Sequence, residues 1–291
     1  MTSKAKIGYV GVGLMGLPMA KRLLSLGYSV RAYDIAPAQV AAARDAGATA
    51  ATCAADAVRG ADLVLLNLPT PEAVEAAVFG ENGAASALKP PQLLIDFSTS
   101  KVYQCKAWAR RLREATGTGW IDAPVSGGPP ASRSGTLTVM AGGEATEIER
   151  AQPLFSDIAG HFTHMGPSGA GMATKMLNQL IVGAGHAVMA EAVVLAEAAG
   201  IDPARLPECL AGGLADSLLL QRLYPRMVKR DFAPQGYVRQ LLKDLEMVNE
   251  FAGALKAPTP MMGEALTLYR MLAHLGHTEL DTAALLKLYE Y

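Results

Sequence analysis

The sequence predicts an α/β fold in which a doubly wound sheet is followed by an all-α domain built on a long inter-domain helix. Up to about residue 166, apolar strand-like runs alternate with helical patterns, the order from which doubly wound sheets are built. After the glycine-rich segment 166–171 the pattern is helical and almost without strands. We therefore expect two domains, 1–166 and 167–291.

The composition excludes several classes of protein. A chain of 291 residues with 51% hydrophobic and 18% charged residues can bury a sizeable core. The formal net charge of -1, with no long run of either sign, gives no electrostatic footprint for nucleic acid or for an anionic membrane. We therefore expect a small-molecule partner.

The cysteines and the N-terminus indicate a cytoplasmic protein. Cys53, Cys105 and Cys209 are far apart and lack the Cys-x-x-Cys spacing, which predicts reduced, buried thiols and neither a disulfide scaffold nor a metal site. Only six residues precede the first apolar run, too few for a signal peptide.

The first turn carries the motif Gly-Val-Gly-Leu-Met-Gly between an apolar run, 7–10, and a helical pattern, 18–26. Strand, glycine turn and helix together are typical of a Rossmann-type dinucleotide site. The first glycine can make the tight turn, the second lets a pyrophosphate approach, and the third lets the helix pack closely. The alternative is a glycine turn without a ligand. The predicted cofactor-binding residues of this turn are Gly11, Gly13, Leu14, Met15 and Gly16.

The second apolar run, 28–33, ends in an acid that indicates which dinucleotide binds. Asp34 can accept hydrogen bonds from an adenosine ribose diol and would repel a 2'-phosphate. No arginine follows it directly, and Arg31 lies three residues back on the opposite face of the strand. We therefore expect NAD rather than NADP.

The other elements of the first domain alternate in the same way. A fully apolar run, 63–66, is typical of a central strand in a parallel sheet. Ligands in such sheets bind beyond the carboxyl ends of the strands. Further strands are expected at 93–97, 120–124, 136–141 and, at the edge, 161–165; helices at 37–46, 51–58, 71–79 and 101–114; and a loop at 125–135.

The second domain begins with an apolar helix, 172–199, that is predicted to be ~40 Å long at 1.5 Å per residue. It is apolar nearly all round, so we expect the first domain and a second subunit to cover part of it, in a homodimer or homotetramer. Its polar residues Asn178, Gln179, His186, Glu191 and Glu197 argue against a membrane span. Shorter helices are expected at 203–211, 217–229, 237–255, 260–275 and 282–291.

Lys175, near the start of this helix, is the candidate for proton transfer. Its neighbours are apolar, and burial lowers the pKa of a lysine from ~10.4 toward that of a general acid or base. A lysine that snorkels to solvent is the alternative. Asn178 and Gln179 lie one turn further on, where they can contact the same bound group. The histidines are placed less well, and His186 is expected to be a hydrogen-bonded packing residue.

Four separated motifs resemble the β-hydroxyacid dehydrogenase family, which includes 3-hydroxyisobutyrate dehydrogenase and tartronate semialdehyde (2-hydroxy-3-oxopropionate) reductase. The motifs are the glycine turn 11–16, the segment 122–128, Gly169-Ala170-Gly171 followed by Lys175, and Lys243-Asp244-Leu245. The resemblance implies that Lys175 is catalytic, that a small carboxylate binds at the serine-glycine-glycine segment, and that Lys243 closes over substrate and cofactor. By the same resemblance, substrate contacts are Ser126, Gly127, Gly128, Asn178, Gln179 and Lys243, and further cofactor contacts are Leu68, Pro69, Ser98, Thr99 and Lys243.

One departure from the family pattern bears on the substrate. Many members have two asparagines where this chain has Asn178 and Gln179, and the asparagine-glutamine form resembles tartronate semialdehyde reductases and L-threonate dehydrogenases. The favoured reading is an NAD-dependent dehydrogenase of a small β-hydroxyacid, with tartronate semialdehyde and glycerate as the substrate pair. Alternatives are a 3-hydroxyisobutyrate or L-threonate dehydrogenase, an imine reductase, and a non-catalytic dinucleotide-binding module.

Overall fold

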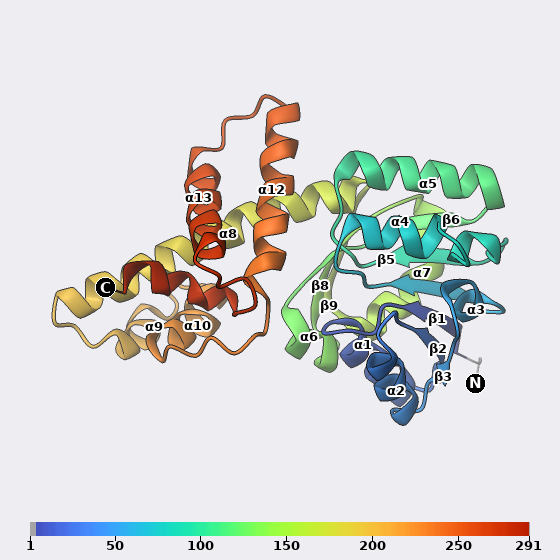
Figure 1. Cartoon of the computed structure of the whole chain (residues 1–291), viewed down its shortest axis with the longest axis horizontal. Coiled ribbons are helices and arrows are strands. Elements are labelled where there is room, and N and C mark those ends of the chain that lie inside the picture. Colours follow the sequence, from blue (N-terminus) through green and yellow to red (C-terminus); the bar gives the residue numbers. More distant parts are fainter. Residues whose placement is uncertain (1–3, 291) are drawn as a thin grey trace. The chain divides into compact units, whose positions relative to one another are not determined.

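The computed structural model describes residues 4–290 and divides into two compact units, the first ending at Lys175 and the second beginning at Met176. The first unit combines a sheet with helices, and the second is helical (Figure 1). This arrangement confirms the predicted fold class. The boundary falls within one unbroken helix, α8 (Ala170–Ala198), later in the chain than the predicted boundary at residue 166.

Within residues 4–290 the sheet has nine strands in the order β3-β2-β1-β4-β5-β6-β8-β7, with β9 paired to β8. Strands β1 to β6 run parallel, β8 is antiparallel to β6 and β7, and β9 is parallel to β8. The chain order therefore reverses direction beside β1, as in other doubly wound sheets. The strands are β1 Lys6–Val10, β2 Ser29–Tyr33, β3 Thr49–Ala50, β4 Leu63–Leu66, β5 Leu93–Asp96, β6 Gly119–Asp122, β7 Val125–Ser126, β8 Leu137–Gly142 and β9 Ala159–Gly166.

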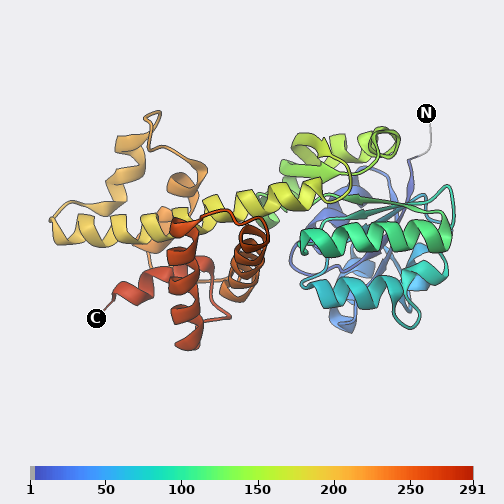
Figure 2. The ribbon, with the colours of Figure 1, turned by 90° about the horizontal axis from the view of Figure 1, so that it is seen from above.

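Helices cover both faces of this sheet (Figures 1 and 2). The helices of the first unit before α8 are α1 Gly16–Ser25, α2 Pro37–Asp45, α3 Ala54–Val58, α4 Pro71–Phe79, α5 Val102–Thr116, α6 Gly128–Ser134 and α7 Ala145–Ile158, with a short 3-10 helix at Ala84–Ser86.

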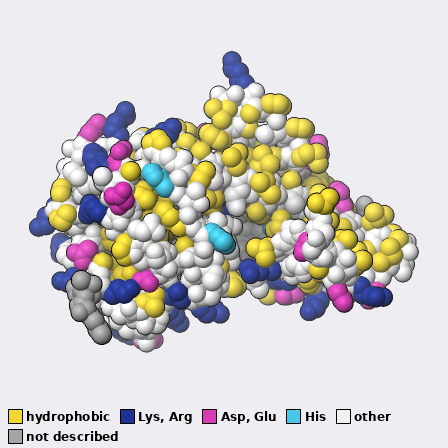
Figure 3. Space-filling view, turned by 180° about the vertical axis from the view of Figure 1, so that it is seen from behind, with side chains coloured by type: hydrophobic (Ala, Val, Ile, Leu, Met, Phe, Trp, Pro, Cys, Tyr) yellow, Lys and Arg dark blue, Asp and Glu magenta, His cyan; other side chains and the backbone are white. Residues whose placement is uncertain are grey.

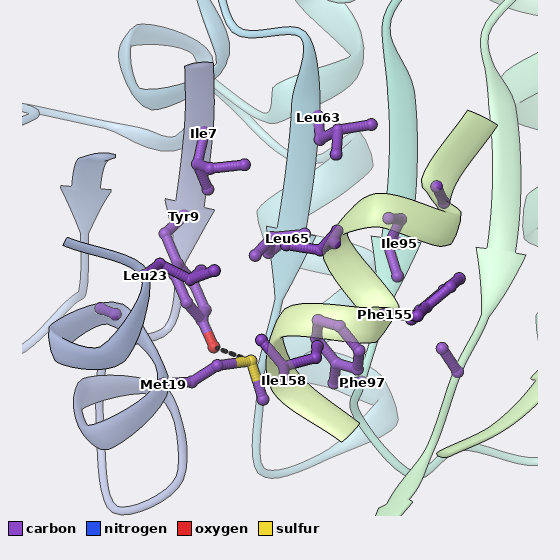
Figure 4. Packing of buried hydrophobic residues seen from close by; sticks show 14 of the residues in the cluster. Ile7, Tyr9, Met19, Leu23, Leu63, Leu65, Ile95, Phe97, Phe155 and Ile158 are labelled. Atoms are coloured by element: carbon purple, nitrogen blue, oxygen red, sulfur yellow. Dashed lines mark hydrogen bonds between the residues drawn. The ribbon is translucent and has the colours of Figure 1, made fainter. Parts of the chain in front are cut away.

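The central strand β4 shows why the sheet has two covered faces. All four of its residues are buried, and alternate side chains join different apolar clusters because successive residues of a strand point to opposite faces. Leu63 and Leu65 pack with Tyr9, whose hydroxyl donates to Met19 Sδ at 3.2 Å (Figure 4). The other two residues of β4 belong to the second cluster. Burial on both faces confirms the predicted central strand.

The predicted loop 125–135 is wrong, because this segment contains β7 and α6. Val125 and Ser126 pair with β8, so tertiary pairing rather than local preference forms that strand. Two prolines follow Gly128 in the first turn of α6, where a missing N–H costs least, and Gly135 ends the helix at φ 71°. Strand β3 and helix α7 were not predicted, and α3 begins three residues later than predicted.

Asp122, the last residue of β6, holds the start of α8 in place. Its Oδ1 accepts from the backbone N–H of Gly169 at 2.7 Å, and its Oδ2 accepts from that of Met172 at 2.9 Å. Two of the N–H groups that have no partner inside the helix are thereby satisfied by one carboxyl group. The contact is close, since a Cβ on Gly171 would lie 2.5 Å from the Asp122 carbonyl oxygen. The first turn of α8 is thus fixed to the sheet.

The second unit consists of the remainder of α8 and shorter helices. The predicted helix 217–229 is divided in two, with Pro225 in the first turn of the second part, and the segment predicted as a helix at 282–291 contains a 3-10 helix at Thr282–Tyr289. Cys209 is exposed and Cys53 half-buried, so the predicted burial of the thiols holds only for Cys105. The elements after α8 are α9 Leu206–Leu210, α10 Leu218–Arg222, α11 Tyr224–Val228, α12 Val238–Ala254 and α13 Pro260–His274, with 3-10 helices at Pro203–Arg205 and Thr282–Tyr289.

Helix α8 exposes a row of large apolar side chains. Leu177, Ile181, Val188 and Leu195 are 58%, 66%, 50% and 71% exposed, and they recur at spacings that keep them on one side of the helix. Figure 3 shows hydrophobic side chains exposed on one face of the helical unit. By length and composition alone this helix could cross a membrane, whereas its polar residues predict that it does not. Its hydrogen-bonded His186 is instead typical of a helix packed inside a protein.

We predict that Asp122 makes stability pH-dependent. Burial raises the pKa of this carboxyl group from 3.8 to about 6. Because the folded state binds the proton more tightly than the unfolded state, the contribution to stability is complete below about pH 4 and is lost as pH rises through about 6. Relative to Asp122→Asn, the wild type should lose about 2 to 3 kcal/mol of unfolding free energy over this range. Urea unfolding at several pH values measures the difference, and parallel pH profiles would contradict it.

Candidate active site

The glycine turn between β1 and α1 has the geometry of a phosphate-binding loop. Gly11 has φ 88°, and a Cβ there would lie 2.4 Å from the Asn67 carbonyl oxygen. A Cβ on Gly16 would lie 2.1 Å from the Gly11 carbonyl oxygen, so only glycine permits this approach of helix to strand. A Cβ on Gly13 would meet nothing within 4 Å. The turn is therefore closed on the protein side and open at Gly13, as the approach of a dinucleotide requires.

Asp34, directly after β2, both shapes this turn and borders a hollow. Its Oδ2 accepts from the Val12 N–H and its Oδ1 from the Ala36 N–H, each at 2.9 Å. The hollow has a volume of about 430 Å³. Arg31 is engaged elsewhere, because it donates to the Asp56 carbonyl oxygen at 3.2 Å. The residues that line the hollow are Tyr33, Asp34, Ile35, Pro37, Val40, Ala41, Arg44, Ala50, Ala51 and Thr52.

The ends of β4 and β5 are joined by a hydrogen bond between two predicted cofactor contacts. The Leu68 N–H donates to Ser98 Oγ at 2.9 Å, and the Ser98 N–H donates to Asp96 Oδ1 at 2.9 Å. Ser98 is buried, Thr99 is half-buried and Pro69 is exposed. The Ser98 hydroxyl thus fixes the backbone that follows β4, and the two predicted segments lie together at the carboxyl edge of the sheet.

The serine-glycine-glycine segment lies where β7 passes into α6. Gly127 has φ 121° and Gly128 has φ 67°, and a Cβ on Gly127 would lie 2.6 Å from the Cβ of Ala131. Ser126 is half-buried. Consecutive residues with positive φ turn the backbone sharply, and N–H groups in such turns form concave sites for anions. This segment can hold a carboxylate.

Lys175 lies against the segment that precedes this turn. The residue is only 6% exposed, so the snorkelling alternative does not describe it. Its Nζ donates to the Val125 carbonyl oxygen at 2.8 Å, although the two residues are 50 apart in the chain. The structure therefore brings the candidate proton-transfer amine and the candidate carboxylate turn together within the first unit.

The predicted contacts Asn178, Gln179 and Lys243 lie in the second unit, where they form a polar chain. Gln179 Nε2 donates to Asp244 Oδ2 at 2.6 Å, and Asn178 Nδ2 donates to Gln179 Oε1 at 2.7 Å. Lys243 Nζ lies 3.3 Å from Asp244 Oδ1. Asp122 and Asp244 were not among the predicted site residues. The available signal was that each lies inside one of the four motifs.

His186 is the hydrogen-bonded packing residue that was expected. His186 Nδ1 shares a hydrogen bond with Tyr269 Oη at 2.8 Å, and burial lowers the His186 pKa to about 4, so the ring is neutral at physiological pH. His164 Nε2 lies 2.9 Å from the Gly143 carbonyl oxygen, at the sheet edge. Within residues 4–290 no cluster of histidine, cysteine, aspartate and glutamate could hold a metal ion.

Comparison with known protein families identifies both parts of the chain. Residues 6–166 match the family described as the NAD binding domain of 6-phosphogluconate dehydrogenase. Residues 169–289 match the family described as NAD-binding of NADP-dependent 3-hydroxyisobutyrate dehydrogenase.

Individual relatives match over nearly the whole length. The 2-hydroxy-3-oxopropionate reductase of Escherichia coli K12 is 34% identical over 98% of this chain and 97% of its own. The NAD-dependent L-serine dehydrogenase of Pseudomonas aeruginosa is 35% identical over 98% of each chain. Among solved structures, a 3-hydroxyisobutyrate dehydrogenase from Mycobacterium tuberculosis, determined with L-serine, has a TM-score of 0.87 at 30% identity and covers 99% of both chains. This chain therefore belongs to the β-hydroxyacid dehydrogenase family of nicotinamide-dependent oxidoreductases.

Proposed function

We propose that this protein is an NAD-dependent dehydrogenase that interconverts glycerate and 2-hydroxy-3-oxopropionate (tartronate semialdehyde). The observation that carries the proposal is the 2.8 Å hydrogen bond from the buried Lys175 amine to the Val125 carbonyl oxygen. It puts a proton-transfer group beside the turn that would bind a carboxylate. A short hydroxyacid needs both groups close together, because few atoms separate its carboxylate from its hydroxyl.

The residues of the first unit fit a bound dinucleotide. The open side of Gly13 leaves room for a pyrophosphate, and the hollow beside Asp34 has a volume suited to part of a nucleotide. The hydrogen-bonded Leu68 and Ser98 would extend the site along the carboxyl edge of the sheet. When bound, the nicotinamide supplies hydride transfer to or from the substrate carbon.

The chain's own residues would bind the substrate and move its proton. Backbone N–H groups at Gly127 and Gly128, with the hydroxyl of Ser126, would anchor the carboxylate. Lys175 would take the proton from the hydroxyl during oxidation and return it to the carbonyl oxygen during reduction. The Val125 carbonyl accepts a hydrogen bond from the Lys175 amine and so orients it beside the turn that would bind the carboxylate.

The choice of substrate rests on the asparagine-glutamine pair at 178–179 and on the full-length similarity to a 2-hydroxy-3-oxopropionate reductase. 3-Hydroxyisobutyrate and L-threonate share the carboxylate and hydroxyl that the first unit would recognise. One methylene changes discrimination by only ~1 to 3 kcal/mol, so these compounds belong in the same assay. L-Serine belongs there too, since a relative of similar identity is an L-serine dehydrogenase.

Replacing Lys175 with alanine should reduce turnover by about 10²- to 10⁴-fold, because the proton-transfer group is lost. Turnover is measured by the near-ultraviolet absorbance of the reduced cofactor with glycerate, 3-hydroxyisobutyrate, L-threonate and L-serine. Cofactor affinity, measured by fluorescence titration, should change less than about 2-fold, since Lys175 is not expected to hold the dinucleotide.

Two results would contradict the proposal. Turnover retained by Lys175→Ala would remove this residue from its role. A wild type that binds NAD but turns over none of the hydroxyacids would favour the non-catalytic module.

Asp34→Asn should weaken the preference for NAD over NADP by about 10-fold, or ~1.4 kcal/mol. Asparagine keeps an oxygen that can accept from the Val12 N–H but removes the charge that repels a 2'-phosphate. The measurement is kcat/KM for each cofactor at saturating substrate. Asp56→Asn, which removes the acid paired with Arg31, serves as a control for lost charge on this side of the sheet. An unchanged ratio in Asp34→Asn would show that another group sets the preference.

We further propose a homodimer or homotetramer, because a helix with the exposed apolar row Leu177, Ile181, Val188 and Leu195 is a typical subunit contact. Light scattering should give two or four times the 30.5 kDa of the chain. Ile181→Glu should lower that mass by placing a charge in the contact, whereas Tyr103→Glu, exposed on α5, should not. A wild-type mass of a single chain would refute the proposal.

A further inference from the structure

Three side chains of the second unit form a hydrogen-bonded chain between α8 and α12. Asn178 donates to Gln179, and Gln179 donates to Asp244, with distances of 2.7 and 2.6 Å. Gln179 is 8% exposed and Asp244 7% exposed, whereas Asn178 is half-buried. This series of hydrogen bonds therefore begins at the buried carboxylate of Asp244 and ends at the half-buried side chain of Asn178, which a ligand can reach.

The carboxylate fixes the orientation of both amides. A carboxylate only accepts hydrogen bonds, so Gln179 must turn its Nε2 toward Asp244, and its Oε1 then faces the other way. Because Gln179 Oε1 also only accepts, Asn178 must turn its Nδ2 toward it. The carbonyl oxygen Oδ1 of Asn178 is left to face away from Gln179. Reversing either amide would place two acceptors against each other.

This order does not arise from the helix alone. Successive residues of an α-helix point about 100° apart, so the side chains of residues 178 and 179 do not ordinarily face each other. Their hydrogen bond requires both amides to lean together, and the tie to Asp244 on α12 holds Gln179 in that position. Breaking a buried bond of this kind leaves a polar group unsatisfied, which costs about 1 to 3 kcal/mol.

We propose that Gln179 is a positioning residue that, oriented by Asp244, makes Asn178 present its Oδ1 acceptor to the hydroxyl group of a hydroxyacid. Gln179 then acts through its neighbour rather than by touching the substrate. The inference rests on the proposed function, because it takes the ligand to be a hydroxyacid. It also explains the length of the side chain: asparagine at 179 would be one methylene too short to keep a 2.6 Å bond to Asp244.

A double-mutant cycle tests the order of donors and acceptors. Gln179→Glu puts two carboxylates together, and Asp244→Asn removes the charge that orients Gln179. The combination Q179E/D244N reverses the pair, because the glutamate can accept from the new asparagine amide and still accept from Asn178. Each variant is assayed for the KM of glycerate and of 3-hydroxyisobutyrate at saturating cofactor, together with kcat and the melting temperature. Glu246→Gln, which removes an exposed acid from α12, is the matched control.

We expect each single variant to raise the KM of the hydroxyacid about 10-fold, which corresponds to the loss of one hydrogen bond. The double variant should return to within about 3-fold of the wild type, with a kcat that changes less than KM. Cofactor KM is measured separately, because Asp244→Asn also removes the acid 3.3 Å from Lys243 and the second substitution does not restore it. The control should leave all three quantities unchanged.

The outcomes separate the inference from the proposed function. An active wild type whose double variant is no better than the worse single variant would overturn the inference, since a direct contact between Gln179 and the substrate predicts that result. Recovery of the melting temperature without recovery of KM would also overturn it, because the pair would then be structural only. A wild type that turns over none of the hydroxyacids would overturn the proposed function, and the inference with it.

Discussion

The candidate site depends on the pair of hydrogen bonds from the start of α8 to the buried carboxyl group of Asp122. They join the end of β6 to the first turn of the helix that carries Lys175, so the amine emerges at a fixed distance from the sheet. The Lys175 bond to the Val125 carbonyl then follows, because that carbonyl lies three residues after Asp122. Burial makes this anchor expensive when it is charged, which is why the pKa of Asp122 is raised to about 6. At neutral pH the ionised Asp122 therefore lowers the free energy of unfolding, while its hydrogen bonds hold the helical turn that leads to Lys175.

Steric exclusion shapes the glycine turn between β1 and α1. The close approaches at Gly11 and Gly16 leave no room for a side chain, whereas a Cβ on Gly13 would meet nothing within 4 Å. Asp34 adds a second constraint, since the hydrogen bond that it accepts from the Val12 N–H fixes the same turn. The charge of this carboxylate would also favour NAD over NADP. Because Asp34 would serve both the structure of the turn and the recognition of the cofactor, its position is constrained more tightly than either role alone would require.

Sequence patterns predicted the elements whose stability is local. The helix at 71–79 and the strand at 63–66 were predicted with the observed bounds, because caps and apolar runs specify them. The loop expected at 125–135 was wrong, since β7 needs β8 and α6 has only seven residues. Burial of Lys175 followed from its apolar neighbours. The bond from Gln179 to Asp244 could not be predicted, because 65 residues separate the partners and no local pattern records their contact.

Helix α8 is the element that makes the candidate chemistry possible with so few residues. It is unbroken from Ala170 to Ala198, although the division between the two compact units falls between Lys175 and Met176. At 1.5 Å per residue, Asn178 and Gln179 follow Lys175 by about 4.5 to 6 Å along the helix axis. That spacing is set by the backbone hydrogen bonds of one helix, so it does not depend on loops or on side-chain packing. The helix backbone therefore fixes the axial spacing between Lys175 and the two amide residues that follow it.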